Sequence, residues 1–248
     1  SSWGNNADRT LKVLCGGEAL PTSLAEGLIP RVSELWNMYG PTEATVWVTR
    51  KRIVNSKDPI TIGTPIHNTR IHILDENLNT LPISVPGELC IAGDNLAIAY
   101  HGRPDLTESA FIEHAQHGRI YRTGDLAKWN ANREVVHLGR IDDQVKIRGY
   151  RIELGEIEKA ILDTNLVQKV AVILAGDSPE LKLVACCKVA EAGVFSESQV
   201  KEKIRKHLPG YMLPQHFVLL DDIPLTNSGK VDRKELCSRS FDLQSRNE

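Results

Sequence analysis

The spacing of apolar residues along the chain predicts a mixed α/β fold. Residues 11–14 form a short apolar run, LKVL, of the kind found in buried strands. Leucines then recur at helical spacing as Leu20, Leu24 and Leu28, which predicts a helix after the intervening glycine pair. From about residue 60 to 140, short alternating runs are separated by Pro, Gly, Asn and Asp, which indicates a compact β-rich subdomain.

The last part of the chain has the pattern of a separate, small α+β unit. Residues 145–152 predict a strand pair or one bent strand, and an apolar stripe over 154–164 predicts an amphipathic helix. Alternating runs at 170–176 and 181–189 are expected to pair as strands.

A final helix and a tail complete the predicted order of elements. Ser196 and Gln199 have the spacing of a capping box, and the Pro-Gly pair at 209–210 is expected to end the helix that they open. The polar sequence after Cys237 is expected to form a frayed tail.

These patterns divide the chain into three parts. Residues 1–141 are expected to form a larger α/β unit, residues 142–238 a small α+β unit, and residues 239–248 the tail. The polar sequence GRIDDQ, at 139–144, lies where the two units meet in the sequence and is the candidate linker.

Charge and composition narrow the possible functions. The 248 residues carry 30 Lys and Arg against 32 Asp and Glu, so the basic surface of a nucleic-acid-binding protein is not expected. No apolar run is long enough to span a bilayer and the first residues do not resemble a signal peptide, so a cytoplasmic protein without membrane contact is expected. The 5 cysteines have no CxxC spacing and predict neither a disulfide framework nor a zinc site.

The segment 36–43 combines residue types that suit nucleotide binding. Tyr39 offers a flat aromatic face beside a rigid Gly-Pro turn, and Thr42 and Glu43 follow with a hydroxyl and a carboxylate. These groups could supply a base-stacking platform, a phosphate donor and a metal ligand. By composition alone, the segment is more typical of an ordinary loop turn.

Three further stretches place charged groups beside glycines. Asp125, in YRTGDL, could accept both hydroxyls of a ribose, although taken alone the stretch is more typical of an Asx-type turn at the end of a strand. Residues 139–158 are typical of a salt-bridged surface strand, but Gly149 within them suggests the close approach of another molecule. Lys230 follows a Ser-Gly turn and could reach an anion; the stretch is not a P-loop, and an exposed turn lysine is the commoner outcome.

Together and in this order, the stretches resemble the adenylate-forming enzymes, and most closely the adenylation domains of nonribosomal peptide synthetases. The family-like motifs are YGPTE at 39–43, GELCIAG at 87–93, YRTGDL at 121–126, the long run at 139–158, LPGYMLP at 208–214 and NSGKVDR at 227–233. The resemblance covers nearly the whole chain. It implies the C-terminal portion of the large α/β adenylation subdomain followed by the small, mobile α+β C-terminal subdomain.

The resemblance also implies a two-step reaction used in making peptide antibiotics and other secondary metabolites. An amino-acid carboxylate attacks the α-phosphate of ATP in the presence of Mg²⁺, and the phosphopantetheine thiol of a peptidyl carrier protein then takes the acyl group. Catalytic roles would fall on Lys230, Thr42, Glu43 and Arg151, with Glu43 as the metal ligand. Contacts to ATP or AMP would come from Gly17, Glu18, Ala19, Asn37, Met38, Tyr39, Gly40, Thr42, Asp125, His137 and Arg140.

In this family the small domain rotates between the two half-reactions about a linker aspartate, which corresponds to Asp142. Lys230 and Arg151 would serve adenylation, and the loop at Gly149 would serve thioester formation. Two departures from the family pattern are His137, where relatives carry an aromatic residue, and NSGK in place of NGK before Lys230.

Matched positions also give part of the substrate pocket. They fall on Leu14, Gly16, Met38, Val46, Trp47 and Lys230. The bulky Met38 and Trp47 are expected to fill the pocket and leave room for a small side chain, with glycine the first choice and alanine next. The alternative is that Trp47 packs into the core.

Two other functions remain open. An acyl- or aryl-CoA ligase of the same superfamily would share several of these motifs, and a nucleotide-binding or carrier-docking fragment would lack independent activity. The second alternative is serious, because relatives are about twice as long and their pyrophosphate-wrapping loop would precede residue 1. The amino acid, the carrier protein and an N-terminal part of the adenylation domain are therefore the expected partners.

Overall fold

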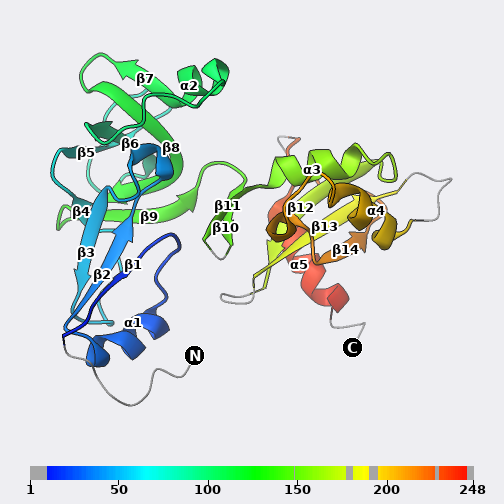
Figure 1. Cartoon of the computed structure of the whole chain (residues 1–248), viewed down its shortest axis with the longest axis horizontal. Helices are drawn as coiled ribbons and strands as arrows, with labels where there is room; N and C mark the ends of the chain where they lie inside the picture. Colours follow the sequence, from blue (N-terminus) through cyan, green and yellow to red (C-terminus); the bar gives the residue numbers. More distant parts are fainter. Residues whose placement is uncertain (1–9, 148, 177–180, 190–194, 227–228, 245–248) are drawn as a thin grey trace. The chain divides into compact units, whose positions relative to one another are not determined.

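The computed structural model describes residues 10–147, 149–176, 181–189, 195–226 and 229–244 (Figure 1). The chain divides into two compact units, Ser1–Asp142 and Asp143–Glu248, called unit 1 and unit 2 below. Both units combine helices with strands, so the predicted α/β class is confirmed. No helix among the described residues is long and apolar enough to cross a membrane.

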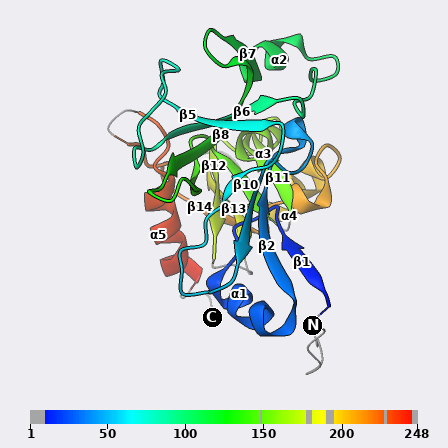
Figure 2. The ribbon, with the colours of Figure 1, turned by 90° about the vertical axis from the view of Figure 1, so that its left-hand side faces the viewer.

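The first sheet of unit 1 is built on a strand–helix–strand unit. Its strands, in the order β1-β2-β3-β4, are Lys12–Cys15, Glu34–Tyr39, Thr49–Ile53 and Thr64–Pro65. β1 and β2 are parallel and are joined by α1, Thr22–Leu28, and the 3-10 turn Ile29–Arg31, whereas β3 runs antiparallel to β2. Buried Ala25 of α1 packs with Leu35 and Ile53, and both views show α1 at one end of this sheet (Figure 2).

This sheet corrects part of the expectation for the N-terminal segment. The strand at 11–14 is present as β1, but it is not buried: exposed and half-buried side chains alternate along it, and Leu14 is 50% exposed. Of the three leucines with helical spacing, Leu20 is buried and Leu28 packs against the same core cluster, whereas Leu24 is 46% exposed. Ala25 is the buried residue within α1.

The second sheet of unit 1 confirms the predicted β-rich subdomain. Its strands are antiparallel in the order β5-β6-β8-β7, and β9 also pairs with β8. They span Thr69–Leu74, Gly87–Gly93, Gly118–Trp129, Phe111–His114 and Val135–Arg140, with the short helix α2, Pro104–Ala110, before β7. Leu89, Ile91 and Tyr121 form the middle of its core, to which Tyr39 of β2 also belongs. Tyr39, the last residue of β2 in the first sheet, therefore packs in the core of the second sheet.

Unit 2 is a three-stranded sheet covered by helices on both faces. Its elements are the hairpin β10 (Gln144–Ile147) and β11 (Tyr150–Glu153), the strands β12 (Lys169–Ala175), β13 (Lys182–Lys188) and β14 (His216–Leu219), the helices α3 (Leu154–Leu162), α4 (Glu197–Ile204) and α5 (Arg233–Gln244), and the 3-10 turn Gly210–Met212. Alternate residues of β12 face opposite ways: Val172 packs with α3 and α4, and Ala171 packs with Leu236 of α5. α5 therefore lies across the sheet from α3 and α4 (Figure 1).

The strand pair, the amphipathic helix and the paired strands predicted for unit 2 are all confirmed. Ser196 is the N-cap of α4, where its hydroxyl accepts a hydrogen bond from the Gln199 amide at 3.4 Å. The helix ends at Ile204 rather than at Pro209, because a turn carries the chain on to buried Leu208.

Two boundaries differ from the prediction. The expected frayed tail begins inside α5, which continues to Gln244 because Leu236 anchors the helix on the sheet; residues 245–248 lie outside the described part. The candidate linker at 139–144 is shorter than expected, since β9 continues through Arg140 and β10 begins at Gln144.

Candidate nucleotide-binding site

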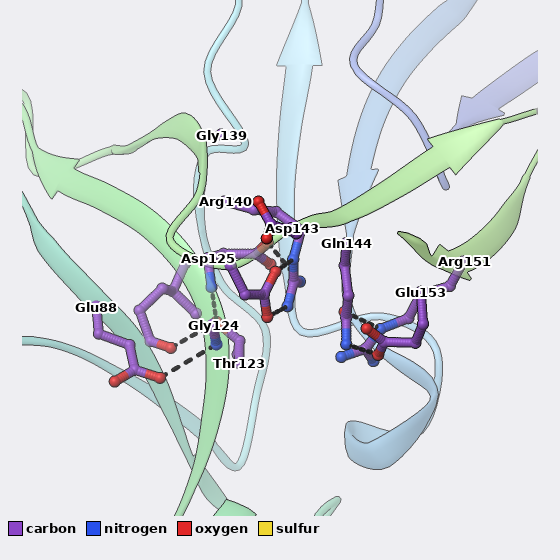
Figure 3. Close-up of polar contacts among 12 residues, drawn as sticks. Glu88, Thr123, Gly124, Asp125, Gly139, Arg140, Asp143, Gln144, Arg151 and Glu153 are labelled. Carbon is purple, nitrogen blue, oxygen red and sulfur yellow. Dashed lines mark hydrogen bonds and ion pairs between the residues drawn. The ribbon is translucent and has the colours of Figure 1, made fainter. Parts of the chain in front are cut away.

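Three strands of unit 1, β2, β8 and β9, bring polar side chains together around Asp125. Tyr39 is the last residue of β2, and the register of β8 with β9 pairs Asp125 with Arg140. The Tyr39 hydroxyl donates to Oδ2 of Asp125. Arg140 Nη1 donates to Oδ1 at 2.9 Å (Figure 3). His137 Nε2 lies 3.4 Å from the same Oδ1. A single carboxylate, 3% exposed, thus has three side-chain partners.

Electrostatics keep this carboxylate charged and the phenol neutral. Burial acts to raise the pKa of Asp125, but the hydrogen bonds from His137 and Tyr39 and the charge of Arg140 outweigh it, so the pKa is lowered. Burial and the neighbouring carboxylate raise the pKa of Tyr39. The result is a permanent anion with a fixed hydroxyl donor beside it, which is suited to accept hydrogen bonds from a diol.

The Thr-Gly-Asp sequence lies within β8, so the alternative of a simple Asx-type turn is wrong. The Thr123 hydroxyl accepts from the Asp125 amide at 2.9 Å and donates to the Leu89 carbonyl at 2.7 Å. The Gly124 amide donates to Glu88 Oε1 at 3.1 Å (Figure 3). These side-chain bonds lie where the register between β6 and β8 shifts.

Gly124 is required at the centre of this irregular strand. Its φ is +70°, and a Cβ there would lie 2.6 Å from Arg140 Nη2 and 2.7 Å from Asp142 Oδ2. The space is filled by a two-point ion pair, since Arg140 Nε and Nη2 each lie 2.5 Å from an oxygen of Asp142. Arg140 therefore connects Asp125 with the predicted hinge residue.

Thr42 and Glu43 lie in a 3-10 turn, Thr42–Ala44, directly after β2. Tyr100 donates its hydroxyl to Glu43 Oε1 at 2.6 Å, and the Ala97 amide donates to the Glu43 carbonyl at 2.8 Å. Thr42 is exposed. Sequence reasoning missed Tyr100, because it stands in no motif and lies 57 residues from its partner.

The donor set at this turn fits a magnesium ion that arrives with a nucleotide. Mg²⁺ is usually held by one or two carboxylates together with substrate phosphates and water. Glu43 provides one carboxylate and Thr42 a nearby hydroxyl. Within the described ranges, no group of three or more His, Cys, Asp or Glu side chains could hold a metal ion by itself.

The predicted adenine-edge residues lie along the ends of β1 and β2. The register pairs Cys15 with Asn37, and a Cβ at Gly16 would lie only 2.9 Å from the Met38 carbonyl, so the two backbones touch. Asn37 is buried, and its Nδ2 donates to the Thr61 carbonyl at 2.9 Å. Gly17, Glu18 and Ala19 follow as an exposed loop.

The predicted pocket residues differ from one another in burial. Met38 is 7% exposed, whereas Trp47 is 43% exposed and Leu14 is half-exposed. The alternative that Trp47 packs into the core of the chain is therefore wrong. Val46 has a φ of 70°, rare for a β-branched residue, and its side chain points largely to solvent. Gly40 allows this turn, because a Cβ there would lie 2.9 Å from the Trp47 Cα.

The other predicted residues belong to unit 2 and are described within it. Gly149 turns the β10–β11 hairpin with a φ of +81° and has open space where a Cβ would stand. Arg151 Nε donates to Gln144 Oε1 at 2.6 Å (Figure 3). Lys230 is exposed in a turn, and its carbonyl accepts from the Thr226 amide at 2.7 Å. Residues 227–228, the start of the NSGK departure, lie outside the described part.

Comparison with known proteins agrees with this geometry. Residues 4–101 match the profile of the AMP-binding enzymes, and residues 156–230 match the profile of the AMP-binding enzyme C-terminal domain. The chain belongs to the AMP-binding enzyme family. The AMP-binding profile includes the Tyr39–Glu43 segment, and the C-terminal profile extends to Lys230.

Several of the similar proteins are nonribosomal peptide synthetases. A dimodular nonribosomal peptide synthase of Bacillus subtilis (strain 168) is 42% identical over 237 residues, covering 94% of this chain and 10% of that protein. The structure of a four-domain synthetase, AB3403, bound to AMP and glycine, is 43% identical with a TM-score of 0.55, covering 94% of this chain and 18% of the other. The Vibrio cholerae adenylation domain AlmE, in complex with glycyl-adenosine-5'-phosphate, is 28% identical with a TM-score of 0.82. That match covers 93% of this chain and 44% of AlmE, so the chain spans less than half of each of these proteins.

Proposed function

We propose that this chain contributes to an amino-acid adenylating site of nonribosomal peptide synthesis. In this reaction an amino acid and ATP give aminoacyl-AMP and pyrophosphate. The observation that carries the proposal is the buried Asp125 carboxylate, held by Tyr39 and Arg140 at positions that match the family motifs and by His137, which departs from them. Such a carboxylate can accept both hydroxyls of a ribose, as acidic residues do in dinucleotide sites.

The surrounding residues then acquire roles that their contacts support. Tyr39 lies against the adenine while its hydroxyl orients Asp125, and Arg140 assists at the ribose. Thr42 contacts a phosphate, and the Glu43 carboxylate, held by Tyr100, receives the metal ion. When bound, Mg²⁺ neutralises charge on the phosphate oxygens.

Lys230 and Arg151 provide the positive charge that adenylation needs. Two unit negative charges about 4 Å apart repel by about 4 kcal/mol at an effective dielectric of about 20. The substrate carboxylate and the α-phosphate are such a pair. Lys230, exposed in its turn, offsets this repulsion by bridging the two groups. Arg151, on the hairpin strand β11, contacts phosphate in the same state.

The second half-reaction transfers the acyl group to a carrier-protein thiol. We place its pivot at Asp142, where the chain passes from unit 1 to unit 2, and its unit 2 surface at Gly149. The structure of holo-PA1221, a synthetase protein with adenylation and carrier domains, supports a carrier partner; it is 28% identical with a TM-score of 0.77, covering 92% of this chain and 40% of the other. We propose further that catalysis takes place in an adenylation domain of the full family length.

Glycine is the proposed substrate. Among the residues predicted for the pocket, Met38 is buried and Trp47 is 43% exposed, and both side chains are large. Two similar proteins, AB3403 and AlmE, hold glycine or a glycyl adenylate in their structures. Two bulky side chains in the predicted pocket set favour the smallest amino acid.

An ATP–pyrophosphate exchange panel on an adenylation domain that contains this chain tests both parts of the proposal. Glycine should give the fastest exchange, alanine a slower one, and leucine and phenylalanine close to none. Preference for leucine or phenylalanine would refute glycine selection, and failure of every amino acid would refute adenylation. Trp47→Ala should extend activity to larger side chains, with Val54→Ala as an exposed control outside the pocket.

A further inference from the structure

Two adjacent aspartates at the boundary between the units are each held by an arginine of their own unit. Asp142 is gripped by Arg140 within unit 1. Asp143 forms a two-point ion pair with Arg233 within unit 2. The Arg233 Nε and Nη2 atoms each lie 3.0 Å from one carboxylate oxygen of Asp143. The only backbone between these anchored residues is the Asp142–Asp143 peptide, so the flexible part of the linker is very short.

The guanidinium of Arg233 also holds two further elements of unit 2. Nη1 donates to Glu158 Oε1 of α3 at 2.9 Å and to the Val172 carbonyl of β12 at 2.9 Å. The same Glu158 oxygen accepts from the Val172 amide at 2.8 Å. The Arg233 side chain is only 21% exposed, and its hydrogen bond and charge lower the pKa of Asp143. Only a planar fork with several donors can satisfy two carboxylates and a carbonyl at once.

Arg233 is also tied closely to the turn that carries Lys230. The Gly229 amide donates to the Thr226 carbonyl at 2.9 Å, and Leu225 and Val231 pair as an antiparallel bridge. The Asp232 amide then donates to the Pro224 carbonyl at 2.9 Å. These backbone bonds close the turn directly before Arg233 in the chain, and the Arg233 amide donates to the Val231 carbonyl at 3.2 Å.

We propose that Arg233 is a positioning residue that locks the Lys230 turn to Asp143, so that the turn and the first residues after the hinge move as one body. Movement about the Asp142–Asp143 peptide then carries Lys230 without loss of its geometry. This consequence rests on the proposed adenylation function. Arg233 itself contacts no reacting group and acts through Lys230.

Hydrogen exchange on the purified 248-residue chain tests the lock without using activity. Arg233→Met should raise exchange at least about tenfold at the amides of Thr226 and Asp232 and in β10. Asp143→Asn is the milder variant, because it leaves the contacts to Glu158 and Val172 intact, and it should raise exchange at the same sites by a smaller factor. Lys234→Met, on the exposed side of α5, is the matched control and should change none of them.

The pattern of exchange decides between positioning and simple stabilisation. If Arg233→Met raises exchange in β12 and β13 as much as in the turn, the substitution destabilises the whole of unit 2. The milder Asp143→Asn variant then provides the test. An Asp143→Asn protein that keeps both the turn and β10 fully protected, or loses protection in only one of them, overturns the proposal.

A second readout links the lock to Lys230. In ATP–pyrophosphate exchange by the adenylation domain, Arg233→Met should lower kcat at least about tenfold while KM for ATP changes less than about twofold. Arg233→Lys should not restore the rate, because a single ammonium cannot replace the fork. A raised KM with normal kcat, or full rescue by lysine, would count against positioning. If the wild-type domain shows no ATP–pyrophosphate exchange, the proposed function is wrong. The hydrogen-exchange result still tests whether Arg233 holds the Lys230 turn to Asp143.

Discussion

The Tyr39 hydroxyl donates to the Asp125 carboxylate across 86 positions of the sequence. Tyr39 ends β2 of the first sheet, and Asp125 lies within β8 of the second sheet. The contact therefore joins the two sheets of unit 1 through the two residues proposed to hold the adenine and the ribose. We therefore expect the stability of unit 1 to depend on this contact.

The first prediction is an energetic coupling between these two residues. Tyr39→Phe removes the donor and Asp125→Asn removes the charge, and each should destabilise unit 1, since hydrogen bonds to charged groups contribute about 1.5–3 kcal/mol. In a double-mutant cycle followed by urea unfolding, the coupling energy should reach about 1–3 kcal/mol. Tyr150→Phe, an exposed residue of unit 2, serves as control. Purely additive effects would show that the hydrogen bond adds no stability.

The second prediction concerns Gly124. Gly124→Ala introduces strain from its φ of +70° and also a clash with the Arg140–Asp142 ion pair. Gly118→Ala is a matched control, because its φ is +69° but it has open space where a Cβ would stand. Strain alone should cost about 1 kcal/mol in the control, and Gly124→Ala should cost more than this, because the Arg140–Asp142 ion pair must also shift. Equal losses in urea unfolding would contradict the proposed packing of the ion pair.

The third prediction is a pH effect that arises from a stack of histidines beside the second sheet. The ring of His72 lies on that of His117 with centroids 3.8 Å apart, and the ring of His114 is 4.5 Å from that of His117. Burial, followed by the charges of His117, Arg70 and His114, lowers the pKa of His72 to about 4. The folded state therefore resists protonation of His72 between about pH 6.5, its usual value in an unfolded chain, and pH 4.

In that window the unfolded chain binds more protons at this residue than the folded one, so stability should fall as the pH falls from about 6.5 to 4. His72→Gln should flatten this part of the pH profile of the urea midpoint. His101→Gln, a change at an exposed histidine, should leave the profile as steep as in the wild type. A His72→Gln profile with unchanged slope would assign the effect to other groups.

The fourth prediction tests the helix that the sequence did not indicate. Leu236 is the fully buried contact of α5 with the sheet of unit 2. Leu236→Ala should destabilise unit 2 by about 2–4 kcal/mol through lost burial and a cavity. Lys234→Ala on the exposed side of α5 should change stability by less than about 0.5 kcal/mol. Loss of less than about 1 kcal/mol in the leucine variant would show that α5 is not anchored there.

Elements with strong periodicity could be predicted from the sequence. Ile157 and Ile161 mark the buried side of α3, and the paired runs at β12 and β13 alternate clearly. α5 could not be predicted, because among its described side chains Leu236 is the one fully buried contact.

The candidate site could be predicted only in part. The resemblance picked out Tyr39, Asp125 and Arg140, which the structure brings together. It gave no hint of the Tyr100 contact to Glu43 or of the grip of Arg233 on Asp143. Both contacts join residues far apart in the chain, and their partners are chosen by strand pairing and packing rather than by any local pattern.

The most direct test of the central claim compares the binding of AMP and of 2′,3′-dideoxy-AMP by calorimetry, in wild-type and Asp125→Asn adenylation domains. If Asp125 holds the ribose, the wild-type protein should bind AMP about 10- to 100-fold more tightly than the dideoxy analogue, because the analogue lacks the two hydroxyls that would donate hydrogen bonds to the charged carboxylate. The Asp125→Asn protein should discriminate only weakly. Equal discrimination by both proteins, or none by the wild type, would contradict the assignment of this carboxylate to the nucleotide.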